Sequence, residues 1–347
     1  MPPIYLEFSE GNEHKFYEIS TDGPRLILRY GRIGTAGQSQ TKIFEDTAAA
    51  EAEAQKKLTE KRRKGYLEAV PGHTGARAVM PARLKLPAGL KPHREKIEVT
   101  LRPVVSLTLS EEPVSAWSSK VGGVPYREQG EVWPRDPADS PLSFLAQLNL
   151  SELPALEGVP TTGLLRFFIG ADVLMGCRFE ADRQPQDTYR VLYTERPITD
   201  DSRLDSSVSV WPSEVEQISP LESSHSLKIT GTLTEMPMTV SDRLFGDTIG
   251  IDFLDDADSP DDGLQLGEYL EEQYREASEV GHQLGGYPTF TQFDPRTREQ
   301  PHVLLFQLCS DALGVMWGDA GIGNFFIHPD ELARRDFSRV FYNWDCS

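Results

Sequence analysis

The stretch LRYGRIGTAGQ, residues 28–38, decides how the first part of this chain folds. It places three glycines, two arginines and one tyrosine within eleven residues. Glycines at this density let the backbone turn tightly and approach a partner closely, and Tyr30 can pack its ring while its hydroxyl stays in water. The stretch therefore predicts a tight turn that leaves polar side chains available for contact.

Alternation of apolar and polar residues around this stretch predicts a small sheet, because half-buried strands alternate in this way. The expected strands are residues 4–8, 15–19, 25–30 and 38–44, with turns at Gly11-Asn12 and Asp22-Gly23. A helix is expected next, capped by Asp46 or Thr47 and running to about Lys64, where Gly65 stops it. Ala48, Ala52 and Leu58 fit the buried side of that helix.

Five residues match the pattern Trp-Gly-Arg-x-Gly-x-x-Gly-Gln, with Tyr30 in the place of the Trp: Gly31, Arg32, Gly34, Gly37 and Gln38. The stretch thus resembles the WGR domain, a small β-rich module of some poly(ADP-ribose) polymerases and of many bacterial proteins. The resemblance implies a WGR-like domain, β-rich with one helix, over residues 1–70. In DNA-repair polymerases, WGR domains contact DNA ends and neighbouring domains, and on that basis Tyr30, Arg32 and Gln38 are candidate partner-binding residues.

Residues 71–96 have the composition of a basic linker between two domains, 1–70 and 97–347. Four prolines interrupt any helix and three glycines loosen the chain; they are Pro71, Pro81, Pro87, Pro92, Gly72, Gly75 and Gly89. Beyond this linker, residues 98–109 alternate like a strand that Pro103 interrupts.

Seven short motifs follow one another in the second domain. They are SSKVGGVP (118–125), WP (133–134), PLSFLAQLNL (141–150), GLLRFFI (163–169), LGGYP (284–288), HVLLFQL (302–308) and MWGDAG (316–321). Their order resembles the YwqG-like family of bacterial proteins over residues 118–347. The family implies a mostly antiparallel fold with two related sheet halves, although the sequence shows no internal repeat. The expected fold class is α+β: a small β-rich domain with one helix, plus a larger, mostly antiparallel α+β domain.

The net charge of −19 is concentrated in the second domain. Residues 101–347 carry 18 Lys and Arg against 41 Asp and Glu, whereas residues 1–100 carry 17 against 13. An acidic body repels nucleic acid phosphates and anionic membranes and attracts basic proteins. Nine carboxylates of its most acidic region are candidate partner-binding residues: Asp252, Asp255, Asp256, Asp258, Asp261, Asp262, Glu268, Glu271 and Glu272.

The acidic run at 252–262 has three interpretations: a solvated loop, a contact surface for a basic protein, or a site for a hard cation such as Ca²⁺ or Mg²⁺. An EF-hand loop needs acids at alternate positions, and Pro260 interrupts that spacing here. We therefore expect no bound metal, and the sequence contains no motif that predicts a cofactor.

Catalytic residue patterns are absent from the sequence. Cys177, Cys309 and Cys346 are widely spaced, the seven histidines are scattered, and no Gly-x-Ser-x-Gly motif is present. The first residues, MPPIYLEFSEGNEH, do not have the pattern of a signal peptide. No segment reaches the roughly 20 apolar residues that a membrane span needs. We expect a cytoplasmic protein that is not an enzyme and is a monomer when free.

These observations favour a bacterial immunity protein, since members of the resembled family often lie beside polymorphic toxin genes. Such a protein would bind and occlude a cognate basic toxin. An ADP-ribosyltransferase is one candidate for this toxin, because WGR domains occur elsewhere together with poly(ADP-ribose) polymerase domains. The alternative is a DNA-linked regulator or repair accessory that uses Arg32 and the basic residues 56–64. A third hypothesis is a metal-dependent hydrolase that uses the 252–262 carboxylates to reverse a toxin's modification.

Overall fold

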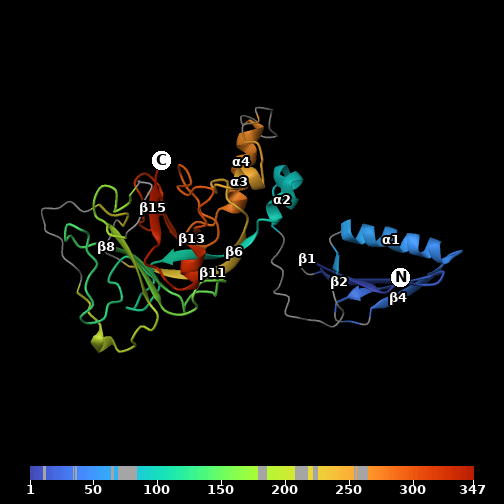
Figure 1. The fold of residues 1–347 in the computed structure, drawn as a ribbon, viewed down its shortest axis with the longest axis horizontal. Helices are drawn as coiled ribbons and strands as arrows, with labels where there is room; N and C mark the ends of the chain where they lie inside the picture. The colour runs from blue at the N-terminus through green and yellow to red at the C-terminus, as the bar shows by residue number, and fades with distance from the viewer. Residues whose placement is uncertain are drawn as a thin grey trace. The chain divides into compact units, whose positions relative to one another are not determined.

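The computed structural model describes residues 1–10, 13–33, 35, 37–63, 66–68, 84–178, 186–207, 218–221, 226–253, 255 and 265–347. The chain divides into two compact units, Met1–Lys85 and Leu86–Ser347 (Figure 1). Each unit has its own sheet. The fold is α+β and mostly β, as the sequence predicts.

The first unit is a five-stranded antiparallel sheet with the order β4-β3-β2-β1-β5. Its strands are β1 (Ile4–Glu10), β2 (Glu13–Asp22), β3 (Arg25–Arg32), β4 (Gln38–Ile43) and β5 (Leu67–Glu68). The predicted strands are all present. The helix α1 (Thr47–Arg63) lies along this sheet and packs on β2 and β3 (Figure 1).

The helix α1 begins where the sequence places it, because the Asp46 carboxylate accepts a hydrogen bond from the Ala49 amide at 2.7 Å. Its buried face consists of Ala50, Ala54 and Leu58, spaced four residues apart. The prediction that Ala48 and Ala52 are buried is wrong, and both are exposed. Because alanines occupy so many successive positions, the sequence is compatible with more than one buried face of the helix. Packing against Leu6, Ile19 and Leu26 decides which face is buried.

The second unit is a ten-stranded antiparallel sheet with the order β10-β9-β8-β7-β11-β6-β12-β13-β14-β15. Its first strands are β6 (Arg102–Ser110), β7 (Lys120–Val121), β8 (Ser143–Asn149), β9 (Leu164–Ile169) and β10 (Tyr189–Thr194). The later ones are β11 (Leu227–Met236), β12 (Gln283–Gly285), β13 (Val303–Cys309), β14 (Ile322–Ile327) and β15 (Phe341–Asp345). The helical segments are η1 (Ala88–His93), α2 (Arg94–Glu98), η2 (Asp201–Arg203), α3 (Phe245–Thr248), α4 (Leu266–Ser278) and α5 (Pro329–Ala333).

This sheet contains two related halves, in which β7–β10 correspond to β12–β15. The sequence KVGGVP at 120–125 corresponds to QLGGYP at 283–288, and both glycine pairs have positive φ, 69° and 71° against 70° and 74°. Both halves also have a bulge in the following strand, at Leu145 in β8 and at Leu305 in β13. The strands that precede the two halves in the chain, β6 and β11, are exchanged between them: β7 pairs with β11, and β12 pairs with β6.

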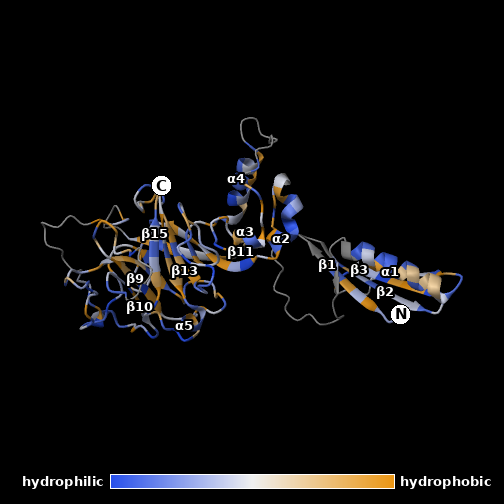
Figure 2. Ribbon diagram, turned by 45° about the horizontal axis from the view of Figure 1, so that its top comes forward, coloured by the Kyte–Doolittle hydropathy of each residue, from blue (hydrophilic) through white to orange (hydrophobic). Residues whose placement is uncertain are grey.

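The core of the second unit is built from the strands, which are predominantly apolar, while the loops around them are polar (Figure 2). Trp317, from the MWGDAG motif between β13 and β14, is fully buried. Its indole lies over Gly323, where an added Cβ would come within 2.8 Å of Trp317 Cε2. Glycine at this position of β14 therefore makes room for the indole.

The predicted linker is wrong over its last residues, because 88–98 form η1 and α2. Leu86, Leu90 and Ile97 are buried, and η1 packs on α4. Burial of these side chains outweighs the helix-breaking tendency of Pro87, the N-cap of η1, and of Pro92, which lies inside η1. Residues 71–83 of the predicted linker lie outside the described residues. The strand predicted from Glu98 begins only at Arg102.

Across the described ranges, no helix is both long enough and apolar enough to cross a membrane.

Candidate functional site

A groove of about 690 Å³ in the first unit contains the residues of the opening stretch. It lies between α1 and the face of β2, β3 and β4. Its lining combines aromatic and cationic side chains: Lys15, Phe16, Tyr17, Leu28, Tyr30, Gly31, Arg32, Gln40, Lys57, Lys61 and Tyr66. Two predicted residues, Tyr30 and Arg32, therefore lie in one groove.

The glycines of the stretch allow a close approach of β3 and the start of β4. A Cβ on Gly31 would lie 2.8 Å from the Gly37 Cα. A Cβ on Gly37 would lie 2.7 Å from the Tyr30 carbonyl oxygen, and Gly37 has a φ of 68°. Only glycine fits both constraints at Gly37 without strain. Gln38 is the partner of Tyr30 in the β3–β4 register and is exposed, but it does not line the groove.

The tyrosines of the groove form a stacked and edge-on cluster. Tyr30 is 37% exposed, and its ring stacks on Tyr17 with centroids 6.1 Å apart. Tyr17 in turn meets the edge of Tyr66 at 6.4 Å. Burial, with Glu60 nearby, raises the pKa of Tyr17 to about 12, so its hydroxyl stays neutral.

The cations of the groove come from both the sheet and the helix. Lys61 Nζ lies 4.3 Å from the ring centroid of Tyr17 and 4.9 Å from that of Tyr66. Lys57, one turn earlier on α1, pairs loosely with Glu53 at 3.7 Å. Among the described residues, no carboxylate lies within 4 Å of the Arg32 guanidinium. The groove can thus bind a ligand with anionic and flat apolar parts.

Sequence reasoning missed Lys15 and Tyr66, whereas Lys57 and Lys61 were predicted as part of the basic residues 56–64 that act with Arg32. The spacing of Lys57 and Lys61, four residues apart on an expected helix, was the available signal. Lys56 is exposed on another face, whereas the side chains of Arg62 and Arg63, and all of Lys64, lie outside the described residues.

The predicted acidic surface is described only in part. Asp252 and Asp255 belong to the described residues, but Asp256, Asp258, Asp261 and Asp262 lie outside them. The described parts of the chain contain no group of three or more metal-ligating side chains.

Some carboxylates of α4 have partners within the helix and some are exposed, and Glu268 is both. The Glu268 side chain accepts a hydrogen bond from the Gln265 amide in a capping box, and Glu271 pairs with Arg275 at 2.8 Å. Glu268, Glu272 and Glu276 recur every four residues, and all three are exposed. They form a carboxylate stripe along one side of the helix.

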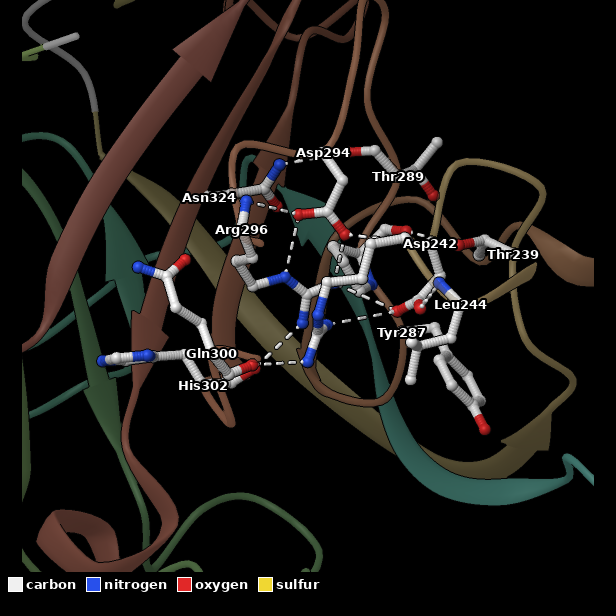
Figure 3. Close-up of polar contacts among 12 residues, drawn as sticks. Thr239, Asp242, Leu244, Tyr287, Thr289, Asp294, Arg296, Gln300, His302 and Asn324 are labelled. Carbon is white, nitrogen blue, oxygen red and sulfur yellow. Dashed lines mark hydrogen bonds and ion pairs between the residues drawn. The ribbon is translucent and has the colours of Figure 1, made fainter. Parts of the chain in front are cut away.

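A buried ionic cluster in the second unit is structural (Figure 3). The Arg296 guanidinium, 5% exposed, meets Asp242 at 3.0 Å and Asp294 at 2.6 Å, and it also donates to the His302 carbonyl at 3.0 Å. The Asp242 carboxylate accepts from the Leu244 amide, which fixes the turn before α3. These contacts compensate the charges within the protein and hold its loops together.

Cys309, His282 and Asp311 lie close together but are not arranged as a nucleophile and its base. The Cys309 amide donates to His282 Nδ1 at 3.0 Å, so the ring proton is on Nε2, which faces Asp311 at 3.2 Å. Burial lowers the pKa of His282 and raises that of the Cys309 thiol to about 12. Both ring nitrogens are occupied, and the thiol stays protonated and unreactive.

The folds of the two units define the class of this protein: a small β-rich module with a cationic groove, followed by a larger antiparallel sheet with two related halves. Comparison with known families agrees. The WGR domain matches residues 3–73. The chain belongs to the family described as a domain of unknown function, DUF1963, which matches residues 119–346 and is the YwqG-like family.

Individual relatives resemble only a short part of the chain. Protein YehF of Escherichia coli strain K12 is 41% identical over 61 residues, 18% of this chain and 22% of YehF. The uncharacterized protein YfeS of the same strain is 34% identical over 61 residues, 18% of this chain and 25% of YfeS. A Bacteroides fragilis protein of known crystal structure is 36% identical over 20% of each chain, with a TM-score of 0.20.

Proposed function

We propose that this protein is a non-enzymatic binding protein that neutralises a cognate basic toxin by covering it, as a bacterial immunity protein does. The observation that carries the proposal is the exposed carboxylate stripe of Glu268, Glu272 and Glu276 on α4. It lies in a region with 41 acidic against 18 basic residues. Complementary charge speeds association, and a protective protein needs fast association.

Two polar clusters among the described residues fit binding better than chemistry. The Cys309 thiol lacks a free base, the Arg296 cluster is closed by its own ion pairs, and covering a toxin needs no reaction from this chain. An ADP-ribosyltransferase is the candidate toxin only because WGR domains are associated with ADP-ribosylation in other proteins.

The test uses the full chain and the toxin encoded beside it. Glu272→Lys combined with Glu276→Lys should weaken the complex by about tenfold or more, mainly through slower association at low salt. Glu111→Lys combined with Glu157→Lys changes the net charge equally at exposed positions outside α4 and should have a smaller effect. A toxin that neither binds nor loses activity in co-expression would rule out the proposal.

A second function is favoured by the groove of the first unit. Its cations and the rings of Tyr17, Tyr30 and Tyr66 suit phosphates and stacked bases. Arg32→Ala with Lys57→Ala should lower affinity for single- or double-stranded DNA and reduce its salt dependence. Lys42→Ala, an exposed change on β4 outside the groove, is the matched control. Equal affinity in all three proteins would show that the groove does not bind DNA.

A further inference from the structure

A second pocket, of about 430 Å³, lies in the second unit around the SSKVGGVP motif. Lys120, Ser115 and Pro125 line it together with Asp201, Asp205 and Ser226. Its volume falls within the range of pockets that bind small molecules. No part of the proposed toxin contact uses this pocket.

Lys120 is the unusual member of this lining, because it is 2% exposed and its ammonium makes one hydrogen bond to the residues that the structure describes. Its ammonium donates to the Ser115 carbonyl at 2.9 Å. Within the described part of the chain, no carboxylate lies within 4 Å of it, and two of its three N–H groups have no protein acceptor. Burying an unpaired ammonium is costly, so a protein rarely retains one without a use.

The other half of the sheet shows that the fold does not need a lysine here. Lys120 pairs with Gln147 across β7 and β8, and the corresponding pair across β12 and β13 is Gln283 with Gln307. The Gln283 amide donates to the carbonyls of Gly285 and Tyr287. The same position is thus filled by a neutral side chain that hydrogen-bonds within its own turn.

The difference extends along the whole cross-strand row. Lys228, Lys120 and Arg166 in one half correspond to Ser106, Gln283 and Asn324 in the other, by the register of both halves. Lys228 pairs with Glu112 at 2.9 Å and Arg166 pairs with Glu131 at 2.8 Å. Of the three cations, Lys120 alone has no carboxylate partner in the described structure.

We propose that this pocket binds the carboxylate of a small molecule, with the Lys120 ammonium as its counter-ion and the Ser115 carbonyl holding that ammonium in place. Asp201 and Asp205 line the same pocket and disfavour a multiply charged head group such as phosphate. Asp205 is already neutralised by Arg127 at 2.8 Å, whereas Asp201 is exposed. Burial, opposed by the charge of Glu152, lowers the pKa of Lys120 to about 8, so most molecules still carry the ammonium at neutral pH.

The experiment follows the Lys120 side-chain resonance in the full chain labelled with ¹³C-lysine. Lys120→Gln assigns the resonance, and it should fold because Gln283 is tolerated at the equivalent position. Acetate, added at constant ionic strength against chloride, should shift this resonance saturably, with half-saturation on the order of 1–50 mM for so small a probe. Inorganic phosphate should shift it less.

Lys228→Gln is the matched control, since it removes a cation from the same row that already has a carboxylate partner. It should leave the acetate response of Lys120 unchanged. A Lys120 resonance that does not move, that moves more with phosphate, or that moves equally with chloride overturns the proposal.

If Lys120→Gln does not fold, the wild-type protein is treated with acetic anhydride instead. Added acetate should then slow the acetylation of Lys120 but not that of Lys228. Equal rates of Lys120 acetylation with and without acetate also overturn the proposal.

Discussion

Gln147 and Gln307 perform the same task in the two halves of the large sheet. The Gln147 side-chain oxygen accepts a hydrogen bond from the Tyr126 amide at 2.8 Å, and the Gln307 oxygen accepts one from the Thr289 amide at 2.8 Å. Each amide group donates to a carbonyl of the segment before its glycine pair: Ala116 and Ser118 for Gln147, Gly281 for Gln307. Each glutamine thereby holds a loop over its own half of the sheet.

Replacing either glutamine should therefore destabilise the second unit. Gln147→Leu and Gln307→Leu each leave a buried backbone amide without its acceptor, which costs about 1–3 kcal/mol of unfolding free energy. Urea denaturation followed by tryptophan fluorescence measures this loss. Gln129→Leu, at an exposed position, should change stability by less than about 0.5 kcal/mol. Similar losses in all three variants would contradict the assigned role.

Gly37→Ala should unfold the first unit more readily than Gly23→Ala. Both glycines have positive φ, 68° and 56°, so either alanine costs about 1–2 kcal/mol in backbone strain. At Gly37 the added methyl also meets the Tyr30 carbonyl, whereas at Gly23 it meets nothing within 4 Å. Thermal denaturation of the two variants gives the difference, and equal transition temperatures would contradict the close approach.

Arg296→Met should be among the most destabilising single changes in the second unit. It removes the cation that pairs with both buried carboxylates, Asp242 and Asp294, and leaves Asp242 only its longer contact with Arg243 at 4.0 Å, which costs about 3–5 kcal/mol. Arg298→Met breaks an exposed pair with Asp247, in which the side chains are 62% and 56% exposed, and should cost about 1 kcal/mol or less. Chemical denaturation that ranks the two equally would show that the Arg296 cluster is not structural.

The second unit should lose stability in mild acid through His302. Burial, together with His328 and the cations Arg296, Arg243 and Arg339, lowers the pKa of His302 from 6.5 to about 4. The unfolded chain therefore takes up a proton below pH 6.5 that the folded chain takes up only near pH 4. The stability from a neutral His302 is complete above pH 6.5 and declines as pH falls towards 4.

His302→Gln should flatten this part of the stability profile, measured as the denaturation midpoint from pH 7 to pH 4. Carboxylates also make the stability depend on pH in this range. The test therefore compares how steeply the denaturation midpoint falls with pH in His302→Gln and in the unmodified protein. Parallel profiles would mean that His302 titrates normally in the folded protein.

The first unit could be predicted from sequence almost element by element, because its strands are short, alternating and bounded by turn residues. Four strands and α1 agree with the prediction. The buried phase of the helix did not follow from the sequence, because alanine is compatible with either face and only the contacts of Leu58 with the sheet decide it.

The related halves of the second unit were implied by family resemblance and not by a visible repeat. Their likeness resides in a few positions, such as the glycine pairs and the two glutamines, while the intervening loops differ in length. The motif SSKVGGVP can be recognised in the sequence, but nothing in the sequence singles out its lysine. A buried lysine cannot be told from an exposed one until its neighbours, here Gln147 and Lys228, are known.

The acidic run was the sequence's clearest charge feature, yet the described structure adds little to it. Only Asp252 and Asp255 of that run are described, and the stripe on α4 emerges instead from Glu268, Glu272 and Glu276. Helical spacing brings these three together, and that spacing could have been read from residues 266–278 had the helix been recognised.

The exchange of β6 and β11 between the halves has a consequence for synthesis on the ribosome. β7 emerges early, but its neighbour β11 follows only after about a hundred further residues, roughly 5–20 s at ordinary translation rates. During that interval the apolar strands β8 and β9 belong to an incomplete nascent chain. Since β7 pairs with β11 and β12 pairs with β6, we expect that neither half completes its sheet by itself and that a truncated product becomes a substrate for chaperones and proteases.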